Sequence, residues 1–376
     1  MRAQVVAAAL LAPLAAVVAP PAAHAGPAGD ADLAVFDGGL TQLAFIGLLQ
    51  AQVVPLVGDD AFLQNGDPAE EPGFRLRRAR FGVHGTAWAD VDYELSFQAT
   101  PAGIDLLDAW MGWRVLSSLS IYGGARKVPF SRFALVGTGD GALADRPLGV
   151  RAMAPFRQVG VTLEGSVGDG LLGWAAGVYN GFSRNAAFAE GYGETAALEG
   201  NRFSNLAYVA RLELAPFGPL GKGLPDLDKG GFRGGLGGAV YYDDGKSVTT
   251  FGYEIDLLVK VAGLHLCAEL IHDSSSPASD PTTTGTLPTD TSRLTFAGEV
   301  GYVILAEQLG VTVRAELVDD DVDLDDNGDQ LVLTGGVQYW FQRHHLAATL
   351  EYTHRAELEG LELDNDSLLL QLQLQL

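Results

Sequence analysis

The sequence predicts an all-β protein, a transmembrane antiparallel β-barrel of about 16 strands occupying residues 39–376. Two patterns predict this fold: segments of about ten residues that alternate between apolar and polar side chains, and connections that alternate between long and short. A third observation is the lack, beyond Ala25, of any apolar run near the roughly 18 residues of a membrane-spanning helix. The 48 glycines in 376 residues also suit strands and tight turns better than helices.

The alternation is clearest in three segments. Residues 206–214 carry Leu206, Tyr208, Ala210, Leu212 and Leu214 on one face, with Arg211 and Glu213 on the other. Residues 251–260 and 346–353 repeat this pattern. Because successive side chains of a strand point to opposite faces, a two-residue period indicates a strand with one apolar face. A strand of about ten residues has the length to cross a bilayer at a tilt.

Sixteen such segments follow one another along the chain. We place them at residues 40–53, 74–86, 91–100, 104–115, 119–130, 158–166, 171–180, 204–214, 232–243, 247–260, 263–272, 293–305, 309–318, 330–340, 345–354 and 367–376. Most connections alternate between long and short, as the long outer loops and short periplasmic turns of bacterial barrels do. Residues 215–231 are the misfit, because they are long but fall among the short turns.

The N-terminus resembles an export signal. Arg2 is followed by an apolar run from Ala3 to Val18, and Ala23-His24-Ala25 has the small residues of a cleavage site. We therefore assign residues 1–25 to a signal peptide and residues 26–38 to a short linker. The alternative is a membrane anchor helix, which normally needs about 20 apolar residues.

The charge balance excludes several classes of protein. The chain has 24 Lys and Arg against 47 Asp and Glu, a net charge of -23. Nucleic-acid binding needs clustered basic residues, so we expect no nucleic-acid partner. A single cysteine, Cys267, excludes an internal disulfide framework. No recognisable catalytic or cofactor motif is present, and we expect no enzyme activity, no cofactor and no metal centre.

The distribution of side chains at strand ends also favours a membrane barrel. Aromatic residues gather there, for example at Trp110 and Trp113 and at residues 339–341. Such girdles mark the membrane interface, although aromatic residues also pack at strand ends in other β-proteins. The final segment, residues 368–376, alternates leucine with glutamine. An exposed strand of this kind would aggregate, whereas in a barrel its leucines contact lipid and its glutamines contact water.

Several stretches resemble the family of phosphate-selective porins O and P. They are FRLRRARFGVHGT from Phe74, DAWMGWR from Asp108, YGGARKVPFSR from Tyr122, RQVGVTLEG from Arg157, GWAAGVYNGFSRN from Gly173, GGVQYWFQRHHLAATLEYTH from Gly335, and the QLQLQ ending. The resemblance implies a 16-stranded outer-membrane porin, usually a homotrimer, that passes anions such as phosphate. It also implies that the third outer loop, Ser131 to Phe156, folds into the lumen.

In a barrel the polar face of each strand points into the lumen, because charge on the lipid face costs about 2–4 kcal/mol at the midplane. The basic residues expected to line the pore and attract anions are Arg78, Arg80, Arg114, Arg126, Lys127, Arg132, Arg146, Arg151, Arg157, Arg211 and Arg314. Because Arg75 and Arg77 break the alternation with Arg78 and Arg80, we expect the first two near the outer headgroups. In the alternative interpretation, lumenal arginines pair with glutamates and brace the wall.

The sequence leaves other functions open. A general or cation-preferring porin fits the fold equally, and a barrel-embedded hydrolase would use residues such as Ser96, His84 and His265. A soluble β-sandwich that binds glycans is a third possibility. Residues 319–329 include part of a calcium-loop pattern, but an acidic hairpin loop explains them better, since position twelve is Thr334.

Overall fold

The computed structural model describes residues 34–37, 41–58, 72–88, 90–100, 103–116, 118–182, 191–192, 194–196, 198, 205–245, 248–277 and 290–376. These all belong to the unit Leu33–Leu376, the second of two units into which the chain divides. The predicted signal peptide, residues 1–25, lies outside the described residues.

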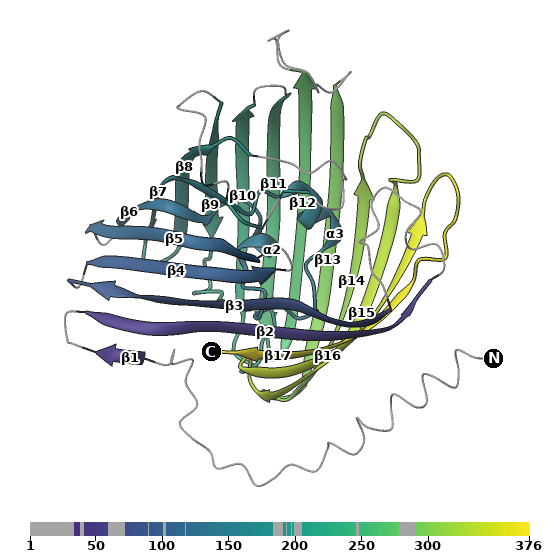
Figure 1. Cartoon of the computed structure of the whole chain (residues 1–376), viewed down its shortest axis with the longest axis horizontal. Helices are drawn as coiled ribbons and strands as arrows, with labels where there is room; N and C mark the ends of the chain where they lie inside the picture. The colour runs from purple at the N-terminus through teal and green to yellow at the C-terminus, as the bar shows by residue number, and fades with distance from the viewer. Residues whose placement is uncertain are drawn as a thin grey trace. The chain divides into compact units, whose positions relative to one another are not determined.

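All 16 predicted strands are present, and together they form a closed antiparallel barrel (Figure 1). They are β2 (Gln42–Val57), β3 (Gly73–Ala87), β4 (Val91–Thr100), β5 (Gly103–Leu116), β6 (Leu119–Lys127), β7 (Arg157–Val167), β8 (Leu172–Asn180), β9 (Leu206–Leu214), β10 (Arg233–Asp244), β11 (Val248–Val261), β12 (Leu264–Pro277), β13 (Thr291–Leu305), β14 (Leu309–Asp319), β15 (Gln330–Gln342), β16 (Leu346–Glu357) and β17 (Ser367–Gln375). Each strand pairs with its neighbours in sequence, and β17 pairs with β2 to close the ring.

A short strand that the sequence analysis missed precedes the barrel wall. Strand β1 (Ala34–Asp37) pairs with the start of β2, within the segment expected to be a linker. Its register joins Asp37 to Gln42 and Ala34 to Ala44, at the end of β2 that extends beyond the pairing with β17. Four residues are too few to show a reliable two-residue period, which explains why the pattern did not reveal it.

The wall alternates as the sequence predicts. Along β9, Tyr208 and Leu212 are exposed while Ala207, Val209 and Arg211 are buried inside. On β11, Phe251 and Ile255 face outward, and Glu254 and Asp256 are each 1% exposed within the barrel. The apolar face is therefore the outer one, as a wall in contact with lipid requires.

Turn geometry accounts for the short connections at one end of the barrel. Between β11 and β12, Ala262 and Gly263 have φ angles of 52° and 93°. Two successive residues with positive φ are typical of the tight type I′ hairpin. Most connections at the opposite end are longer, and one of them, between β6 and β7, carries the helices α2 (Arg132–Leu135) and α3 (Leu148–Met153).

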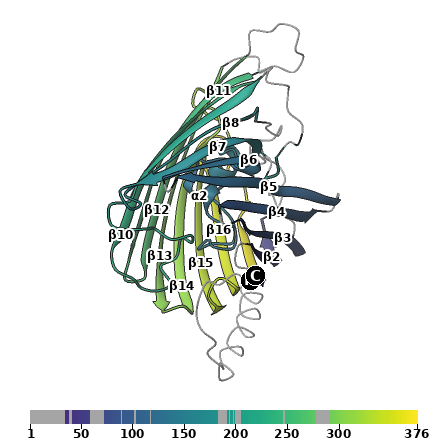
Figure 2. The same ribbon diagram turned by 90° about the vertical axis from the view of Figure 1, so that its left-hand side faces the viewer.

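The predicted inward loop, residues 131–156, lies inside the barrel, and α2 and α3 appear within the ring of strands (Figures 1 and 2). Strand β6 ends at Lys127, three residues before the predicted end. Val128 donates its backbone N–H to the Phe156 carbonyl at 2.9 Å, and Pro129 has no N–H to continue the ladder. These two features lead the chain off the wall and into the lumen.

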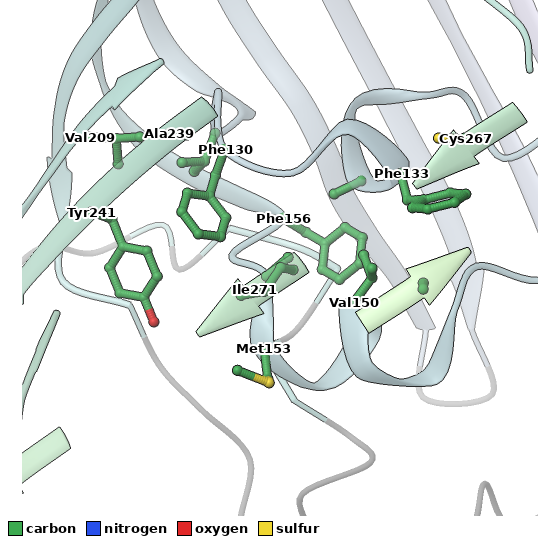
Figure 3. Close-up of a cluster of buried hydrophobic side chains, with 14 of the residues drawn as sticks. Phe130, Phe133, Val150, Met153, Phe156, Val209, Ala239, Tyr241, Cys267 and Ile271 are labelled. Atoms are coloured by element: carbon green, nitrogen blue, oxygen red, sulfur yellow. The ribbon is translucent and has the colours of Figure 1, made fainter. Parts of the chain in front are cut away.

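Apolar packing holds one side of the inward loop against the wall (Figure 3). Phe133, Met153 and Phe156 from the loop are each at most 3% exposed, and they belong to one buried cluster with side chains of the wall. Tyr241 and Ile271 represent the wall strands β10 and β12 in that cluster. This packing fixes the loop against β9–β12.

Wall glutamates hold the other parts of the inward loop. Glu269 on β12, Glu316 on β14 and Glu351 on β16 accept backbone N–H bonds from the loop. The donors are Phe133 at 2.9 Å, Leu148 at 2.5 Å and Ala144 at 2.8 Å. Carboxylate acceptors satisfy backbone donors that the loop cannot expose to bulk water, and hydrogen bonds of this charged kind are stronger than neutral ones.

The misfit connection, residues 215–232, also turns into the barrel. Leu220, Leu224 and Leu227 are buried, and Leu224 donates its N–H to the Asp140 carbonyl of the inward loop at 3.0 Å. This connection is therefore long because it packs inside the barrel and contacts the inward loop, although it lies at the short-turn end. Together the inward loop and residues 215–232 fill the lumen beside β10–β17, where most inward side chains are buried, whereas several inward side chains of β3–β7, such as Glu94 and Glu164, are partly exposed.

Replacing Val313, which is 62% exposed on the outer face of β14, by arginine tests the assignment of that face to lipid. We expect Val313→Arg to lower the free energy of unfolding in phospholipid vesicles by about 2–4 kcal/mol if the site is near the midplane. Val313→Leu is the control and should unfold like the wild type. Equal stability of all three proteins in a denaturant titration would show that this face does not contact hydrocarbon.

Candidate functional site: the basic neck of the lumen

The open part of the lumen lies between the inward loop and β3–β7, and we call it the neck. A cavity of about 300 Å³ occupies it, with four basic side chains, Arg80, Arg126, Lys127 and Arg157, and two acidic ones, Glu94 and Asp108, among its lining. A second cavity of about 430 Å³ lies nearer the short turns, beside Ser120 and Trp174. Arg126 lines the first cavity and Glu164 lines the second, and the two side chains form an ion pair at 3.1 Å.

Four arginines of β3 point into the lumen because of a β-bulge. Gln50 of β2 pairs with Arg78, but the next residue, Ala51, pairs with Leu76, so Arg77 is the extra residue. The bulge resets the alternation. Arg75 donates to Gln52 at 2.6 Å and Arg77 to Asp145 at 3.1 Å, so the expectation that both lie near the outer headgroups is wrong.

Asp145 of the inward loop binds two of these arginines. Arg77 contacts both of its carboxylate oxygens, at 3.1 and 3.2 Å, and Arg78 donates to it at 2.9 Å. Burial raises the pKa of the Asp145 carboxyl, but Arg77 and Arg78 outweigh burial and hold that pKa well below its usual range. Asp145 is therefore ionised at neutral pH and fastens the loop to β3.

Glu194, from the connection between β8 and β9, reaches the same group of arginines. Its carboxylate contacts Arg80, lies 3.3 Å from Arg78, and lies 3.9 Å from Arg146 of the inward loop. Burial raises the pKa of Glu194, but Arg78 and Arg80 reverse this effect and hold the pKa well below its ordinary value. The negative charge of Glu194 is thus permanent near neutral pH.

Three further basic residues line the neck in different ways. Arg157 forms a two-pronged pair with Asp108, with nitrogen–oxygen distances of 2.9–3.1 Å. Lys127 donates to the carbonyls of Leu135 and Val136 at 2.9 and 3.1 Å. Arg126 lies over the Tyr122 ring, 4.0 Å from its centroid. Lys127 lines the neck cavity while it holds the inward loop.

Other predicted site residues brace the wall. Arg132 and Arg211 both bind Asp256, and Arg211 also pairs with Glu254 at 2.9 Å. Arg314 pairs with Glu316 at 2.9 Å and is buried. A charge buried in such pairs is neutralised locally and contributes little to the field in the neck.

The 11 predicted site residues therefore separate by location. Those at or beside the neck are Arg78, Arg80, Arg126, Lys127, Arg146 and Arg157, and those in buried pairs elsewhere are Arg132, Arg211 and Arg314. Arg114 lies at the short-turn end of β5, paired with Asp92 at 3.3 Å. Arg151 lies on α3, beside a small cavity that Asp145 and Arg314 also line.

The sequence reasoning missed Arg77, Asp108, Asp145 and Glu194 as members of the neck. Asp145 is one of several charged residues in the inward loop with no distinguishing pattern, and Glu194 falls in a connection without any pattern. The bulges that turn Arg77 and Leu107 inward leave no mark on the hydrophobic period. The only available signal was the number of arginines in residues 75–80, which is too high for one face of a regular strand.

The weaker motifs do not assemble into sites. Ser96 on β4 and His265 on β12 lie on opposite walls of the ring, and Ser96 donates to Asp108 rather than to a histidine. In the acidic segment 319–329, burial and Asp326 raise the pKa of Asp320 to about 6. Among the residues that the structure describes, no cluster of acidic, histidine or cysteine side chains is arranged to hold a metal ion. The described helices include none that is long and apolar enough to cross a membrane.

Comparison with known proteins supports the resemblance seen in the sequence. Residues 58–211 match the model of the family described as phosphate-selective porin O and P. None of the curated proteins matches the chain by sequence.

Solved porin structures share the fold. OmpT of Vibrio cholerae aligns at a TM-score of 0.58 and 12% identity, covering 91% of this chain and 99% of its own. An anion-selective porin from Comamonas acidovorans aligns at 0.57 and 12%, covering 89% and 100%. Salmonella typhi OmpF, solved with daunomycin, aligns at 0.56 and 12%, covering 90% and 98%.

The ion pairs of Asp145 predict how acid affects the neck. Because its folded pKa is depressed, Asp145 stabilises the barrel fully above its unfolded pKa, and this contribution is lost as the pH falls through the folded value. We expect the difference in unfolding free energy between wild type and Asp145→Asn to stay constant from about pH 8 to pH 5 and to shrink only below about pH 4. A difference that already disappears near pH 6 in denaturant titrations would contradict this assignment.

Proposed function

We propose that this chain, an outer-membrane porin related to the phosphate-selective porins O and P, forms a water-filled channel that favours small hydrophilic anions such as phosphate. The observation that carries the proposal is the lining of the neck, with four basic side chains against two acidic ones in a strongly acidic protein. Selectivity arises where a pore is narrowest, because ions there lose part of their water shell and feel the wall charges most strongly.

The positions of the basic residues support this preference. Arg80 and Arg126 side chains are 9% and 18% exposed, and both line the neck cavity. Their guanidinium groups are fixed, Arg80 by Gln98 and Thr138 and Arg126 by its ion pair and the Tyr122 ring. A fixed guanidinium offers several N–H donors to a passing oxyanion without losing side-chain entropy.

We propose that solutes cross the channel by passive diffusion, without a chemical reaction. The fold and the family favour a channel, and Ser96 and His265 stand on opposite walls, which argues against a hydrolase built from them. A general or cation-preferring porin is the second candidate, and it is favoured by the excess of 47 acidic over 24 basic residues. The charges at the neck should affect selectivity more than the net charge of the chain, because solvent-exposed charges more than about 8–10 Å from a passing ion are largely screened by salt.

We further propose that export depends on a cleaved signal peptide at residues 1–25 and that the assembled form is a homotrimer embedded in outer-membrane lipid. The trimer is supported by a structure of Vibrio cholerae OmpT described as a trimer form, which this chain resembles at a TM-score of 0.58. The outward apolar faces of the strands supply the surface for both lipid and neighbouring copies.

Reversal potentials across planar bilayers test the anion preference. We expect wild type to pass anions in preference to cations in a salt gradient. The double variant Arg80→Gln/Arg126→Gln should lower the anion-to-cation permeability ratio by about 30-fold, since each of the two charges is worth about 1 kcal/mol at 4 Å in water, a factor of about five. Arg114→Gln/Arg343→Gln is the control, because it removes two charges near the short turns and should change the ratio little.

A wild-type channel that prefers cations would end the anion proposal but leave the porin itself intact. A control that lowers the ratio as much as the neck variant would show that total charge, and not the neck, sets selectivity.

A further inference from the structure

Glu194 occupies a cradle of guanidinium groups at the neck. Its two carboxylate oxygens contact Arg78 and Arg80, and Arg146 lies 3.9 Å away. The peptide carbonyl of Glu194 also accepts from Arg157 at 3.4 Å. A carboxylate gripped by several guanidinium groups has the arrangement that proteins use to bind oxyanions.

The cradle contains more arginines than carboxylates that pair with them. Asp145 engages Arg77 and Arg78, and Asp108 engages Arg157. For Arg80 and Arg146, the ion pairs seen within the described part of the chain are those with Glu194. Removing the Glu194 carboxylate therefore leaves two guanidinium charges without their carboxylate partner.

The cradle does not depend on Glu194 for its shape. Arg80 is held by Gln98 at 2.7 Å and by Thr138 at 2.8 Å. Arg146 donates to the carbonyls of Phe133 and Val136, at 2.9 and 2.8 Å. Because these contacts come from β4 and the inward loop, both guanidinium groups should keep their positions when the carboxylate leaves.

Glu194 is more exposed than the arginines that hold it. Its side chain is 26% exposed, whereas those of Arg78, Arg80 and Arg146 are 1%, 9% and 10% exposed. The nearby Tyr192 hydroxyl lies 3.1 Å from that of Tyr241, and the Tyr192 ring packs on Phe182. Glu194 thus lies two residues from an anchored tyrosine, and its side chain is more exposed than those of the three arginines around it.

We propose that Glu194 is a built-in occupant of an oxyanion-binding site, and that carboxylate or phosphate anions in the lumen compete with it for Arg80 and Arg146. This inference rests on the proposed function, since anions must enter the neck to compete. The tethered carboxylate keeps the site weak for passing anions, so ions move on rather than remain bound. Fast release is what a conducting channel needs from a binding site.

Inorganic phosphate as an inhibitor of chloride current tests this inference in planar bilayers. With Glu194→Gln we expect phosphate to inhibit at about tenfold lower concentration than in wild type, because an open guanidinium cradle binds oxyanions strongly. Glu213→Gln is the matched control: it also removes one lumenal glutamate, but its partner Arg132 lies outside the neck and keeps Asp256 as a second carboxylate partner. It should leave the phosphate concentration dependence as in wild type.

Two further variants complete the test. Adding Arg80→Gln to Glu194→Gln should abolish the gain in phosphate inhibition. If Glu194→Gln does not assemble, Glu194→Asp withdraws the carboxylate by one methylene and should give a smaller shift in the same direction. Equal phosphate inhibition of wild type and the assembled Glu194 variants would overturn the inference and make Glu194 a wall brace. A cation preference in wild type and in Glu213→Gln would instead refute the proposed function, so the two failures are distinct.

Discussion

The pairing of β17 with β2 is the contact on which the rest of the structure depends. A backbone N–H or carbonyl exposed to hydrocarbon costs several kcal/mol, so a sheet can cross a membrane only when it has no free edge. Gln371 of β17 lies opposite Gln52 of β2, and Leu372 lies opposite Ala51, which closes the ring between the two ends of the barrel sequence. Closure separates an outer apolar surface from an inner polar one, and every later feature is a consequence of this separation.

The inner surface then has to satisfy its own polar groups, and it does so unequally around the ring. Beside β10–β17 the inward carboxylates accept hydrogen bonds from the backbone of the inward loop or pair with arginines. Beside β3–β7 the loop accepts a hydrogen bond from Lys127 of β6 and leaves the neck cavity open. The passage and its excess of basic groups therefore arise from where the loop is anchored. Lumenal arginines line the passage beside β3–β7, whereas beside β10–β17 they pair with acidic residues and brace the wall.

The fold could be predicted almost completely from the sequence because a closed barrel repeats one simple rule. The two-residue period and the strand length of each segment are visible locally, and all 16 segments were found within a few residues. The inward loop could be expected only from the family resemblance, since no local pattern shows where a loop folds. Residues 215–232 show the same limit, because only their excess length hinted at a fold into the mouth.

The neck was harder to predict because its geometry depends on irregularities and on contacts between distant segments. A single bulge places Arg77 and Arg78 on the same side, which strict alternation forbids. Glu194 meets Arg80 over a separation of 114 residues, and Asp145 meets Arg78 over 67. Predicting which lumenal charges remain open to water requires knowing these partners, and composition or spacing alone does not reveal them.

The most direct test of the account is chemical access to alternate residues of β7 in a variant whose native Cys267 is replaced by alanine. Single cysteines at Val161, Leu163, Glu164 and Ser166 would be exposed to charged, membrane-impermeant thiol reagents while channel current is recorded. The account predicts reaction and a change of current at residues 164 and 166, which line the lumen, faster for the anionic reagent, and no reaction at residues 161 and 163, which face lipid. Equal labelling of all four positions, or labelling without any effect on current, would contradict a water-filled lumen bounded by this wall.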